Sequence, residues 1–384
     1  MTEKSAKPQL RFAGFDDTWE QRKAVDIADY SKGNGYSKSD LTEIGTPIIL
    51  YGRLYTKYQF AIDEVDTFAT PKDGSIYSQG NEVIIPASGE TAEDIARASA
   101  VEKSGILLGG DLNILRPFNF INPLFLALTI SNGEPQKELA KKAQGKSVVH
   151  IHNSDIQEVT VSFPTRAEQD RIVAVFRSLD NLITLHQRKY DKLTNVKKSM
   201  LEKMFPKNGS NVPEIRFKGF SDTWEQRKVS ELFRVTRGYV LAATQTETAK
   251  TDQKPYPVYS SQTKDKGLMG YYKDYLYEDA ITWTTDGANA GTVNYRAGKF
   301  YCTNVCGVLL SNEVKANQMI AEALNNVAKG YVSYVGNPKL MNNVMADIVI
   351  QIPTQAEERE QLSSFFTNLD NLITLHQREC FLSI

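Results

Sequence analysis

The sequence predicts an α+β fold in which two mainly β domains are separated by long antiparallel coiled-coil helices, with a pseudo-twofold internal repeat. Two pairs of repeated segments predict it. Residues 8–23 recur as residues 213–228 with the shared string Asp-Thr-Trp-Glu-Gln-Arg-Lys, and residues 179–188 recur without change as residues 369–378. Between these repeats the two halves share only a faint outline, so constant and variable segments alternate along the chain.

The composition fits a globular protein with two cores. The chain has 384 residues, of which 41% are hydrophobic and 24% charged, as expected of soluble two-domain proteins. Its start lacks an apolar signal region, no stretch could span a bilayer, and three cysteines make no disulfide framework, so we expect a cytoplasmic protein without membrane contact. The net charge of −1 is low for a free-standing DNA binder, so a role on DNA would require basic partners.

The repeats divide the chain into six segments. We expect an N-terminal arm (residues 1–23), a first β domain (24–163), a central helix (164–207), a linker with the repeated arm (208–228), a second β domain (229–352) and a shorter C-terminal helix (353–384).

Each variable segment predicts a mainly β domain with a few helices, because short β-like runs end in glycine turns. Helices are expected at residues 122–130 and 317–327. Two pairs of runs correspond between the halves: residues 47–52 with 257–262, and residues 82–89 with 280–287.

The segment after each variable domain predicts a long amphipathic helix. Apolar residues follow a three-four spacing from Phe176 to Met204, and Thr165 offers an N-cap. At 1.5 Å per residue, residues 168–205 would extend roughly 57 Å. Such a helix cannot bury its stripe alone, so we expect it to pack antiparallel against the copy that begins near Ala356. The expected interface residues are Leu179, Ile183, His186, Tyr190, Leu193, Leu369, Ile373 and His376.

Several strings imitate catalytic or metal motifs. Asn122-Pro-Leu-Phe125 resembles the loop that holds a flipped adenine in amino-methyltransferases, but its second proline is replaced by leucine and no glycine-rich cofactor loop precedes it. Gly145-Lys-Ser147 resembles the end of a P-loop without the strand-loop-helix context. Cys302 and Cys306 lack a second ligand pair at zinc-site spacing. We therefore expect no catalytic residue, bound cofactor or metal site in this chain.

The four histidines fall into two pairs. His150 and His152 would share one face of a strand. His186 and His376 occupy the same position of the two helical copies, where a place in the helix interface is favoured over metal binding or acid-base chemistry.

Polar and aromatic loops at matching places in the two halves are candidates for DNA contact, because such side chains reach base edges or phosphates. In the first half these are Tyr51, Arg53, Tyr55, Lys57, Ser88, Glu90, Thr91 and Lys146. In the second half they are Tyr259, Ser260, Ser261, Gln262, Lys264, Thr284, Thr285, Asp286, Asn289 and Lys339.

The repeated motifs allow a comparison with known families. Arg-Phe-x-Gly-Phe-x-x-x-Trp-Glu precedes each variable domain, and Pro-Thr-x-x-Glu followed by Leu-Asp-Asn-Leu-Ile-Thr-Leu-His-Gln-Arg comes after each. Essentially the whole chain thereby resembles the specificity subunit of a Type I restriction-modification enzyme.

That resemblance implies a non-catalytic subunit that recognises a bipartite double-stranded DNA target. Each variable domain would be a target-recognition domain for one half-site, and the constant helices would separate the two domains and dock two methyltransferase (modification) subunits. Adenine-N6 methylation with S-adenosylmethionine, and cleavage driven by ATP and Mg²⁺ in restriction/translocase subunits, would belong to these partners. The helix length would then act as a ruler for the gap between half-sites.

The second helical copy departs from the first. The first continues sixteen residues past Arg188 to Met204, whereas six residues follow Arg378. The second copy also has one more residue between its proline and Leu-Asp. We therefore expect a shorter second helix, unequal docking of the two partners and an unsettled register near residues 357–366.

Two other function classes stay open. A self-sufficient DNA methyltransferase or nuclease would need a cofactor loop or a carboxylate cluster for a metal ion. A coiled-coil scaffold with two β-rich binding modules would account for the helical periodicity, but not for the alternation of constant and variable segments.

Overall fold

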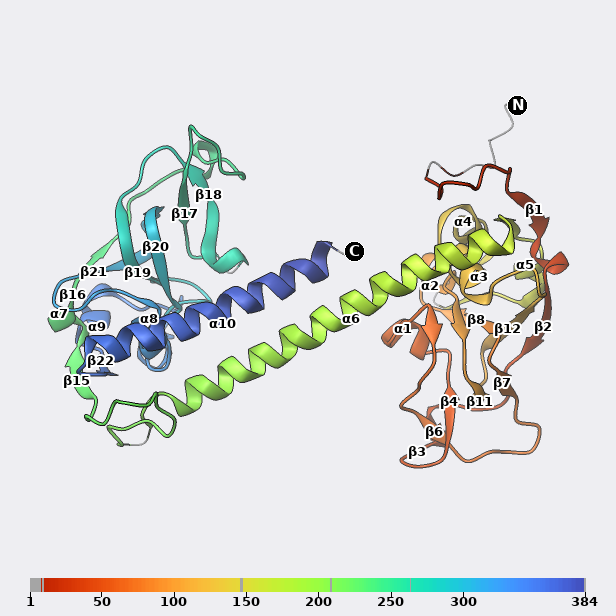
Figure 1. The fold of residues 1–384 in the computed structure, drawn as a ribbon, viewed down its shortest axis with the longest axis horizontal. Coiled ribbons are helices and arrows are strands. Elements are labelled where there is room, and N and C mark those ends of the chain that lie inside the picture. The colour runs from red at the N-terminus through yellow and green to blue at the C-terminus, as the bar shows by residue number, and fades with distance from the viewer. Residues whose placement is uncertain (1–7, 9, 146–147, 208, 263, 383–384) are drawn as a thin grey trace. The chain divides into compact units, whose positions relative to one another are not determined.

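The computed structural model describes residues 8, 10–145, 148–207, 209–262 and 264–382, with the side chains described up to residue 379. The chain divides into two compact units, residues 1–181 and residues 182–384, and helix α6 contributes to both (Figure 1). None of the described helices combines the length and apolar character that a membrane span needs.

The first unit is built mainly from short strands. Its strands are β1 (Glu20–Lys23), β2 (Ala28–Lys32), β3 (Leu41–Thr42), β4 (Thr46–Ile49), β5 (Ala61–Ile62), β6 (Phe68–Ala69), β7 (Tyr77–Gln79), β8 (Glu82–Pro86), β9 (Ser88–Gly89), β10 (Ser99–Val101), β11 (Ser104–Leu108), β12 (Leu112–Pro117), β13 (Val149–His150) and β14 (Thr160–Phe163). Its helices are η1 (Ala24–Asp26), η2 (Lys38–Asp40), α1 (Arg53–Thr56), α2 (Ala92–Ile95), α3 (Pro123–Ile130), α4 (Gly133–Lys142), α5 (Asn153–Gln157) and the start of α6 (Arg166–Lys203).

Strand β8 lies at the centre of this unit. It is the middle strand of a five-stranded sheet with the order β2-β12-β8-β10-β5, and a second five-stranded sheet has the order β3-β6-β4-β11-β7. Side chains alternate across a strand. Val83 and Ile85 therefore join the hydrophobic cluster that includes α3, whereas Ile84 joins the cluster on the opposite face. The apolar run of the sequence is thus a strand buried on both faces.

The second unit is also built mainly from strands, but most of them belong to one larger sheet. Its strands are β15 (Glu225–Lys228), β16 (Phe233–Arg237), β17 (Tyr256–Tyr259), β18 (Leu268–Tyr272), β19 (Tyr277–Thr284), β20 (Val293–Cys302), β21 (Cys306–Ser311) and β22 (Val349–Ile352). Its helices are α7 (Val229–Leu232), η3 (Ala243–Gln245), η4 (Lys264–Gly267), α8 (Gln318–Asn325), η5 (Ala328–Tyr331), α9 (Asn342–Asp347), α10 (Ala356–Leu382) and the second part of α6. Six strands form a sheet with the order β16-β21-β19-β20-β17-β18.

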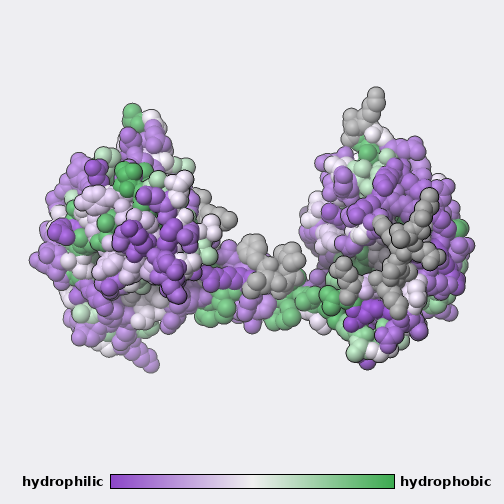
Figure 2. Space-filling model, turned by 90° about the horizontal axis from the view of Figure 1, so that it is seen from above, coloured by the Kyte–Doolittle hydropathy of each residue, from purple (hydrophilic) through white to green (hydrophobic). Residues whose placement is uncertain are grey.

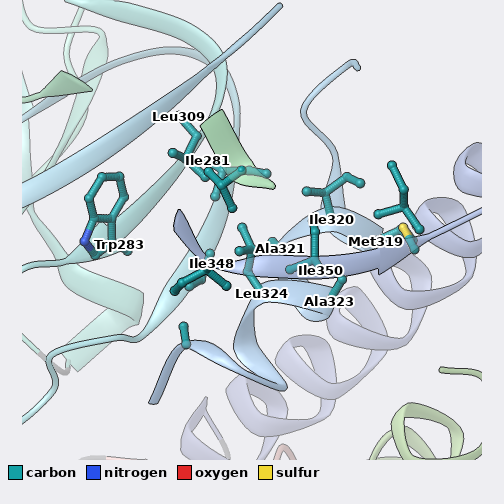
Figure 3. Packing of buried hydrophobic residues seen from close by; sticks show 14 of the residues in the cluster. Ile281, Trp283, Leu309, Met319, Ile320, Ala321, Ala323, Leu324, Ile348 and Ile350 are labelled. Carbon is teal, nitrogen blue, oxygen red and sulfur yellow. The ribbon is translucent and has the colours of Figure 1, made fainter. Parts of the chain in front are cut away.

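The core of the second unit lies between this sheet and helix α8. Ile281 and Trp283 of β19 belong to one cluster with apolar side chains of α8 and β22, several of which are labelled in Figure 3. The indole Nε1 of Trp283 donates a hydrogen bond of 3.0 Å to the Leu340 carbonyl oxygen. A Cβ atom at Gly307 would lie 2.1 Å from the Trp283 ring, so β21 requires glycine at the point where it crosses the indole.

The registers of the two sheets confirm the faint similarity between the variable segments. One row of paired residues across β2, β12, β8 and β10 corresponds to one row across β16, β21, β19 and β20. The rows are Tyr30, Leu115, Val83 and Ala100 in the first unit, and Val235, Leu309, Ile281 and Tyr295 in the second.

The predicted match of residues 47–52 with 257–262 agrees with the strand pairing if the successive strands β10 and β11 of the first unit together correspond to the single long strand β20. Strand β4 pairs in parallel with β11 through Ile48 and Leu107, and β17 pairs in parallel with β20 through Val258 and Tyr301. Parallel neighbours are a minority in sheets made mainly of antiparallel pairs, so this shared pairing indicates one fold for both variable domains.

The repeated segments form the same frame around each domain. Strand β1 pairs with β14, and β15 pairs with β22, so each repeated arm closes its domain against the strand that precedes the long helix. Arg11 donates two hydrogen bonds to Glu168, at 2.9 and 2.7 Å, and Arg216 donates two to Glu358, both at 2.7 Å. Both carboxylates are 1% exposed. Each pair joins the two ends of one repeat.

The second pair settles the register that the sequence leaves open. Glu358, and not the Glu357 of the Pro-Thr-x-x-Glu motif, is the counterpart of Glu168. The additional residue of the second copy lies in the loop before the helix: residues 164–165 connect β14 to α6, whereas residues 353–355 connect β22 to α10. The helices themselves therefore match residue for residue, 190 positions apart.

The helices expected at residues 122–130 and 317–327 are confirmed as α3 and α8. Each begins with an asparagine N-cap: Asn122 Oδ1 accepts from the Leu124 and Phe125 amides, and Asn317 Oδ1 accepts from Ile320. A capping side chain of this kind satisfies backbone N–H groups at a helix start.

The same asparagines also bind the long helices. The Asn122 amide donates to Asp170 of α6 at 2.7 Å, and the Asn317 amide donates to Glu360 of α10 at 3.4 Å. Asp170 and Glu360 are equivalent residues of the two copies. Each long helix is therefore held to its domain in the same way.

Helices α6 and α10 pack antiparallel within the second unit, as predicted. Contacts join His186 to His376 and Lys197 to Asp370, and Phe205 just after α6 contacts Phe366. Residue numbers therefore increase along one helix as they decrease along the other. Ile183, His186, Tyr190, Leu193 and Ile373 are less exposed than most of the flanking helical residues, as expected at a coiled-coil seam. The predicted seam residue Leu369 is buried, whereas Leu179 is 37% exposed.

Candidate nucleic-acid interface

The second unit contains a polar pocket of about 210 Å³ next to its central strands. Four of the residues predicted from the sequence line it: Ser260, Gln262, Thr284 and Asn289. Ser260 and Gln262 follow the end of β17, and Thr284 ends β19. These loops come together because β17 and β19 are both neighbours of β20 in the sheet.

Arg296 of β20 forms part of the pocket wall, and sequence reasoning missed it. Its side chain is buried, and its guanidinium lies 3.6 Å from the centroid of the Tyr259 ring. Nε donates to Thr282 Oγ1 at 3.0 Å and Nη2 donates to the Lys266 carbonyl oxygen at 2.7 Å. These hydrogen bonds fix its plane and go to two neutral oxygen atoms.

Burial lowers the pKa of Arg296, but an arginine side chain stays protonated at neutral pH. A fixed guanidinium on a pocket wall can bind a phosphate, or O6 and N7 of a guanine. In the sequence, Arg296 stands out only as an arginine within a largely apolar strand. A structural salt bridge would account for such an arginine equally well.

The other predicted residues of the second half lie around this pocket rather than in it. Tyr259 packs beneath Arg296. Thr285 is buried, and its hydroxyl lies 2.7 Å from Asp286 and 3.0 Å from the Val305 carbonyl oxygen. Asp286 pairs through its backbone with Lys339. Ser261 is partly exposed in the loop after β17, and the side chain of Lys264 lies outside the described part of the chain.

The first unit brings together Tyr51, Tyr55 and Ser88. The Tyr55 hydroxyl donates to the Ser88 carbonyl oxygen at 2.8 Å, and the Tyr51 and Tyr55 rings meet edge to face with centroids 6.4 Å apart. Ser88 Oγ lies 3.1 Å from His150 Nδ1, because β9 pairs with β13. His150 therefore joins this group, and His152 lies beyond the end of the strand. Tyr51 and His150 are exposed, so the group is accessible from solvent.

The charged candidates of the first half are engaged with their own loop. Arg53 donates to Asp66 at 2.9 Å and to Gln59 at 2.9 Å, and Lys57 forms an ion pair with the same Asp66. The two cations lower the pKa of Asp66, with Lys57 as the larger cause. Both cations would have to exchange partners to reach DNA.

The remaining candidates of the first half lie near the start of α2. Thr91 caps that helix by accepting a hydrogen bond of 3.0 Å from the Asp94 amide, and Glu90 is exposed beside it. Lys146 lies outside the described residues.

The strings that imitate catalytic motifs have structural roles where they are described. Asn122 is the N-cap of α3. Cys302 and Cys306 are buried, and burial raises the pKa of Cys306 to about 11. A thiol with so high a pKa is a poor nucleophile and metal ligand. A shallower hollow beside Phe217 and Phe365 contains none of the predicted residues.

Both copies of the repeated helix present leucines to solvent. Leu182 and Leu185 of α6 are 47% and 46% exposed, and their equivalents Leu372 and Leu375 of α10 are 43% and 49% exposed. Hydrophobic surface follows the exposed helices in Figure 2. Leucines repeated in sequence and exposed in both copies are typical of a surface that binds a partner.

Comparison with known proteins agrees with this architecture. The family model of the Type I restriction modification DNA specificity domain matches residues 16–195 and 221–380. A Mycoplasma pneumoniae protein, named as the N-terminus of a type I specificity subunit, is 37% identical over 131 residues, which cover 33% of this chain and 68% of that protein.

Two solved structures have a similar fold. The S subunit of the Type I restriction-modification system of M. genitalium has a TM-score of 0.72 at 14% identity, covering 99% of this chain and 95% of that one. A chain from work on complex assembly and conformational transition of the type I R-M system has a TM-score of 0.50 at 12% identity, covering 98% and 95%. The resemblance inferred from the repeated motifs is confirmed, and the chain belongs to the family of Type I restriction modification DNA specificity domains.

Proposed function

We propose that this chain reads a bipartite double-stranded DNA target, with one half-site for each of its two β domains, residues 24–163 and 229–352. One observation carries the proposal. The same frame of paired arms, Arg–Glu pairs and capped helices occurs twice, whereas the polar groups inside differ: Tyr55 with Ser88 in the first domain, and a pocket with Arg296 in the second.

This division suits a protein that recognises two different short sequences. Direct reading of bases depends on the identity and position of a few polar side chains. A conserved frame with different polar residues therefore supports two readers of unlike specificity on one scaffold.

We further propose that two modification subunits dock on the repeated helices. The exposed pairs Leu182 with Leu185 and Leu372 with Leu375 are related by the repeat, so two copies of one partner could each use the same leucines. The net charge of −1 supports partners that supply much of the phosphate contact.

We assign the chemistry to these partners. Methylation of adenine N6 with S-adenosylmethionine would occur in the modification subunits, and cleavage with ATP and Mg²⁺ in restriction/translocase subunits. The capping role of Asn122 and the raised pKa of Cys306 support a non-catalytic chain. Because its target is DNA, we place the complex in the cytoplasm.

The test is to map methylated adenines in cells that express the chain together with its modification subunits. Asn289→Ala changes a residue of the second pocket only. We expect altered bases in one half-site and an unchanged second half-site. Methylation by the purified chain alone would favour a self-sufficient enzyme, and failure to co-purify with modification subunits would favour a scaffold.

A further inference from the structure

Two histidines and one glutamate converge where α6 and α10 pack together in the second unit. His186 Nδ1 lies 3.0 Å from His376 Nδ1, and Glu379 Oε2 lies 2.6 Å from His186 Nδ1 and 3.2 Å from His376 Nδ1. The histidine side chains are 18% and 14% exposed. Three potential metal ligands thus surround one point at the edge of the seam.

The internal repeat explains why the histidines meet. In an antiparallel pair of equivalent segments, a residue contacts its own counterpart only at the pseudo-twofold axis. His186 and His376 are such counterparts, so the axis of the helix pair passes between them. The counterpart of Glu379 is Lys189, and the cluster therefore has one carboxylate rather than two.

Hydrogen bonds alone cannot satisfy all three contacts among the two Nδ1 atoms and the carboxylate oxygen. A neutral imidazole carries one N–H group and one lone pair, and an ionised carboxylate only accepts. With both Nδ1 atoms and the carboxylate oxygen in mutual contact, at least one contact joins two lone pairs or two N–H groups. A cation at the centre would attract all three donor atoms at once.

We propose that His186, His376 and Glu379 bind a divalent transition-metal ion of the Zn²⁺ class. Zn²⁺ binds histidine nitrogen at about 2.0–2.1 Å and carboxylate oxygen at about 2.0–2.2 Å, which places neighbouring tetrahedral ligands roughly 3.3 Å apart. The observed separations of 2.6 to 3.2 Å reach that value by movements of less than about 1 Å. Imidazole and carboxylate ligands suit Zn²⁺, and a fourth position is left for water or another ligand.

The ion would cross-link the two helices through ligands from both. It would join the middle of α6 to the end of α10, beyond Leu369 in the domain core and beyond Asp370, which contacts Gln318 and Lys266. This cross-link would fix the register of the helix pair at the pseudo-twofold axis. This role is independent of the DNA contacts proposed above, so its failure would leave that proposal unaffected.

The test is a titration of the full chain with ZnCl₂ near neutral pH, followed by calorimetry, in a Cys380→Ser background that removes the thiol next to Glu379 in the sequence. We expect about one Zn²⁺ per chain. His186→Asn and His376→Asn should each weaken binding by at least ~10-fold. His152→Asn is the matched control, because His152 is exposed at the start of α5 and lies outside the cluster.

A second variant keeps the two histidines in place. Glu379→Lys installs the residue of the first copy on a side chain that is 37% exposed, and it should also weaken Zn²⁺ binding by at least ~10-fold. Co²⁺ gives an independent signal, because visible absorption bands of a tetrahedral Co²⁺ site should appear and then vanish on addition of Zn²⁺. Undiminished binding in the variants of the three ligands, an equal loss in His152→Asn, or no Zn²⁺ binding by the parent chain would each overturn the proposal.

Discussion

The pairs Arg11–Glu168 and Arg216–Glu358, in which the carboxylates are buried, join residues 157 and 142 positions apart. Each connects an arm that precedes a β domain to the helix that follows it. Hydrogen bonding to Glu168 and Glu358 is the largest cause of the raised pKa of Arg11 and Arg216, which agrees with a charged pair at both places. These contacts explain why the repeated motifs occur at both ends of each domain.

Loss of one carboxylate from such a pair should be costly. Glu358→Gln leaves the partly buried Arg216 guanidinium without its charge partner, so we expect a loss of about 1–3 kcal/mol in the free energy of unfolding. Denaturant unfolding followed by circular dichroism measures it. Glu357→Gln is the control, since the neighbouring Glu357 is exposed and should change stability by less than about 0.5 kcal/mol. Equal effects of the two changes would contradict the register described above.

Arg296 permits a prediction about recognition. Arg296→Lys keeps a positive charge but loses the planar group that stacks on Tyr259 and binds Thr282. Lysine does not replace arginine at stacked or bidentate sites. We expect methylation at the cognate site to fall by at least ~10-fold, and other bases to be accepted within one half-site. Sequencing of methylated adenines measures both effects. Arg237→Lys, on an exposed residue of β16, should leave the pattern unchanged.

At the scale of elements, the sequence predicts most reliably what it repeats. The arms and long helices follow from identical strings, and the seam through Ile183 and Leu193 follows from helical spacing, which is a local property. The additional residue before α10 could not be placed, because Glu357 and Glu358 are equally acidic and the distinction lies in a contact with Arg216. Only packing across many residues decides such a register.

The candidate sites show the same limit. Ser260, Gln262, Thr284 and Asn289 were predicted as polar residues near strand ends, and they do line one pocket. Arg296 could not be recognised, because its role depends on the pairing of β17 with β20. Strand order arises from contacts between distant segments, which residue spacing does not encode.

Substitution of the exposed repeated leucines should impair binding of the modification subunits without impairing folding. Replacement of Leu372 and Leu375 by glutamate places charge on exposed positions of α10, so stability should change little. Burial of a leucine in an interface contributes about 1.5–3 kcal/mol, so the double variant should lose one bound modification subunit. Native mass spectrometry would count the subunits, with Asn371→Glu as the control for added charge. Retention of two subunits would exclude this surface as the docking site.

At the scale of the whole molecule, α6 is one unbroken helix from Arg166 to Lys203 that contributes to both units. Its length is therefore a candidate for the property that sets the gap between the two half-sites. Of its contacts with α10, that of Lys197 with Asp370 lies after Arg188, whereas that of His186 with His376 lies before it. An insertion of about one turn directly after Arg188 lengthens the helix and keeps the contacts that follow it, while His186 moves away from His376 by that turn.

Insertion of four helix-forming residues after Arg188 adds about 6 Å along the helix axis, which corresponds to about two base pairs of DNA at 3.4 Å each. We expect the methylated site to keep both half-site sequences while the gap between them grows by about two base pairs. Mapping methylated adenines in cells that also express the modification subunits measures both quantities. Insertion of the same four residues in the exposed loop of residues 248–250 is the control and should leave the gap unchanged. An unchanged gap in the helix variant, with methylation retained, would show that α6 does not determine the spacing.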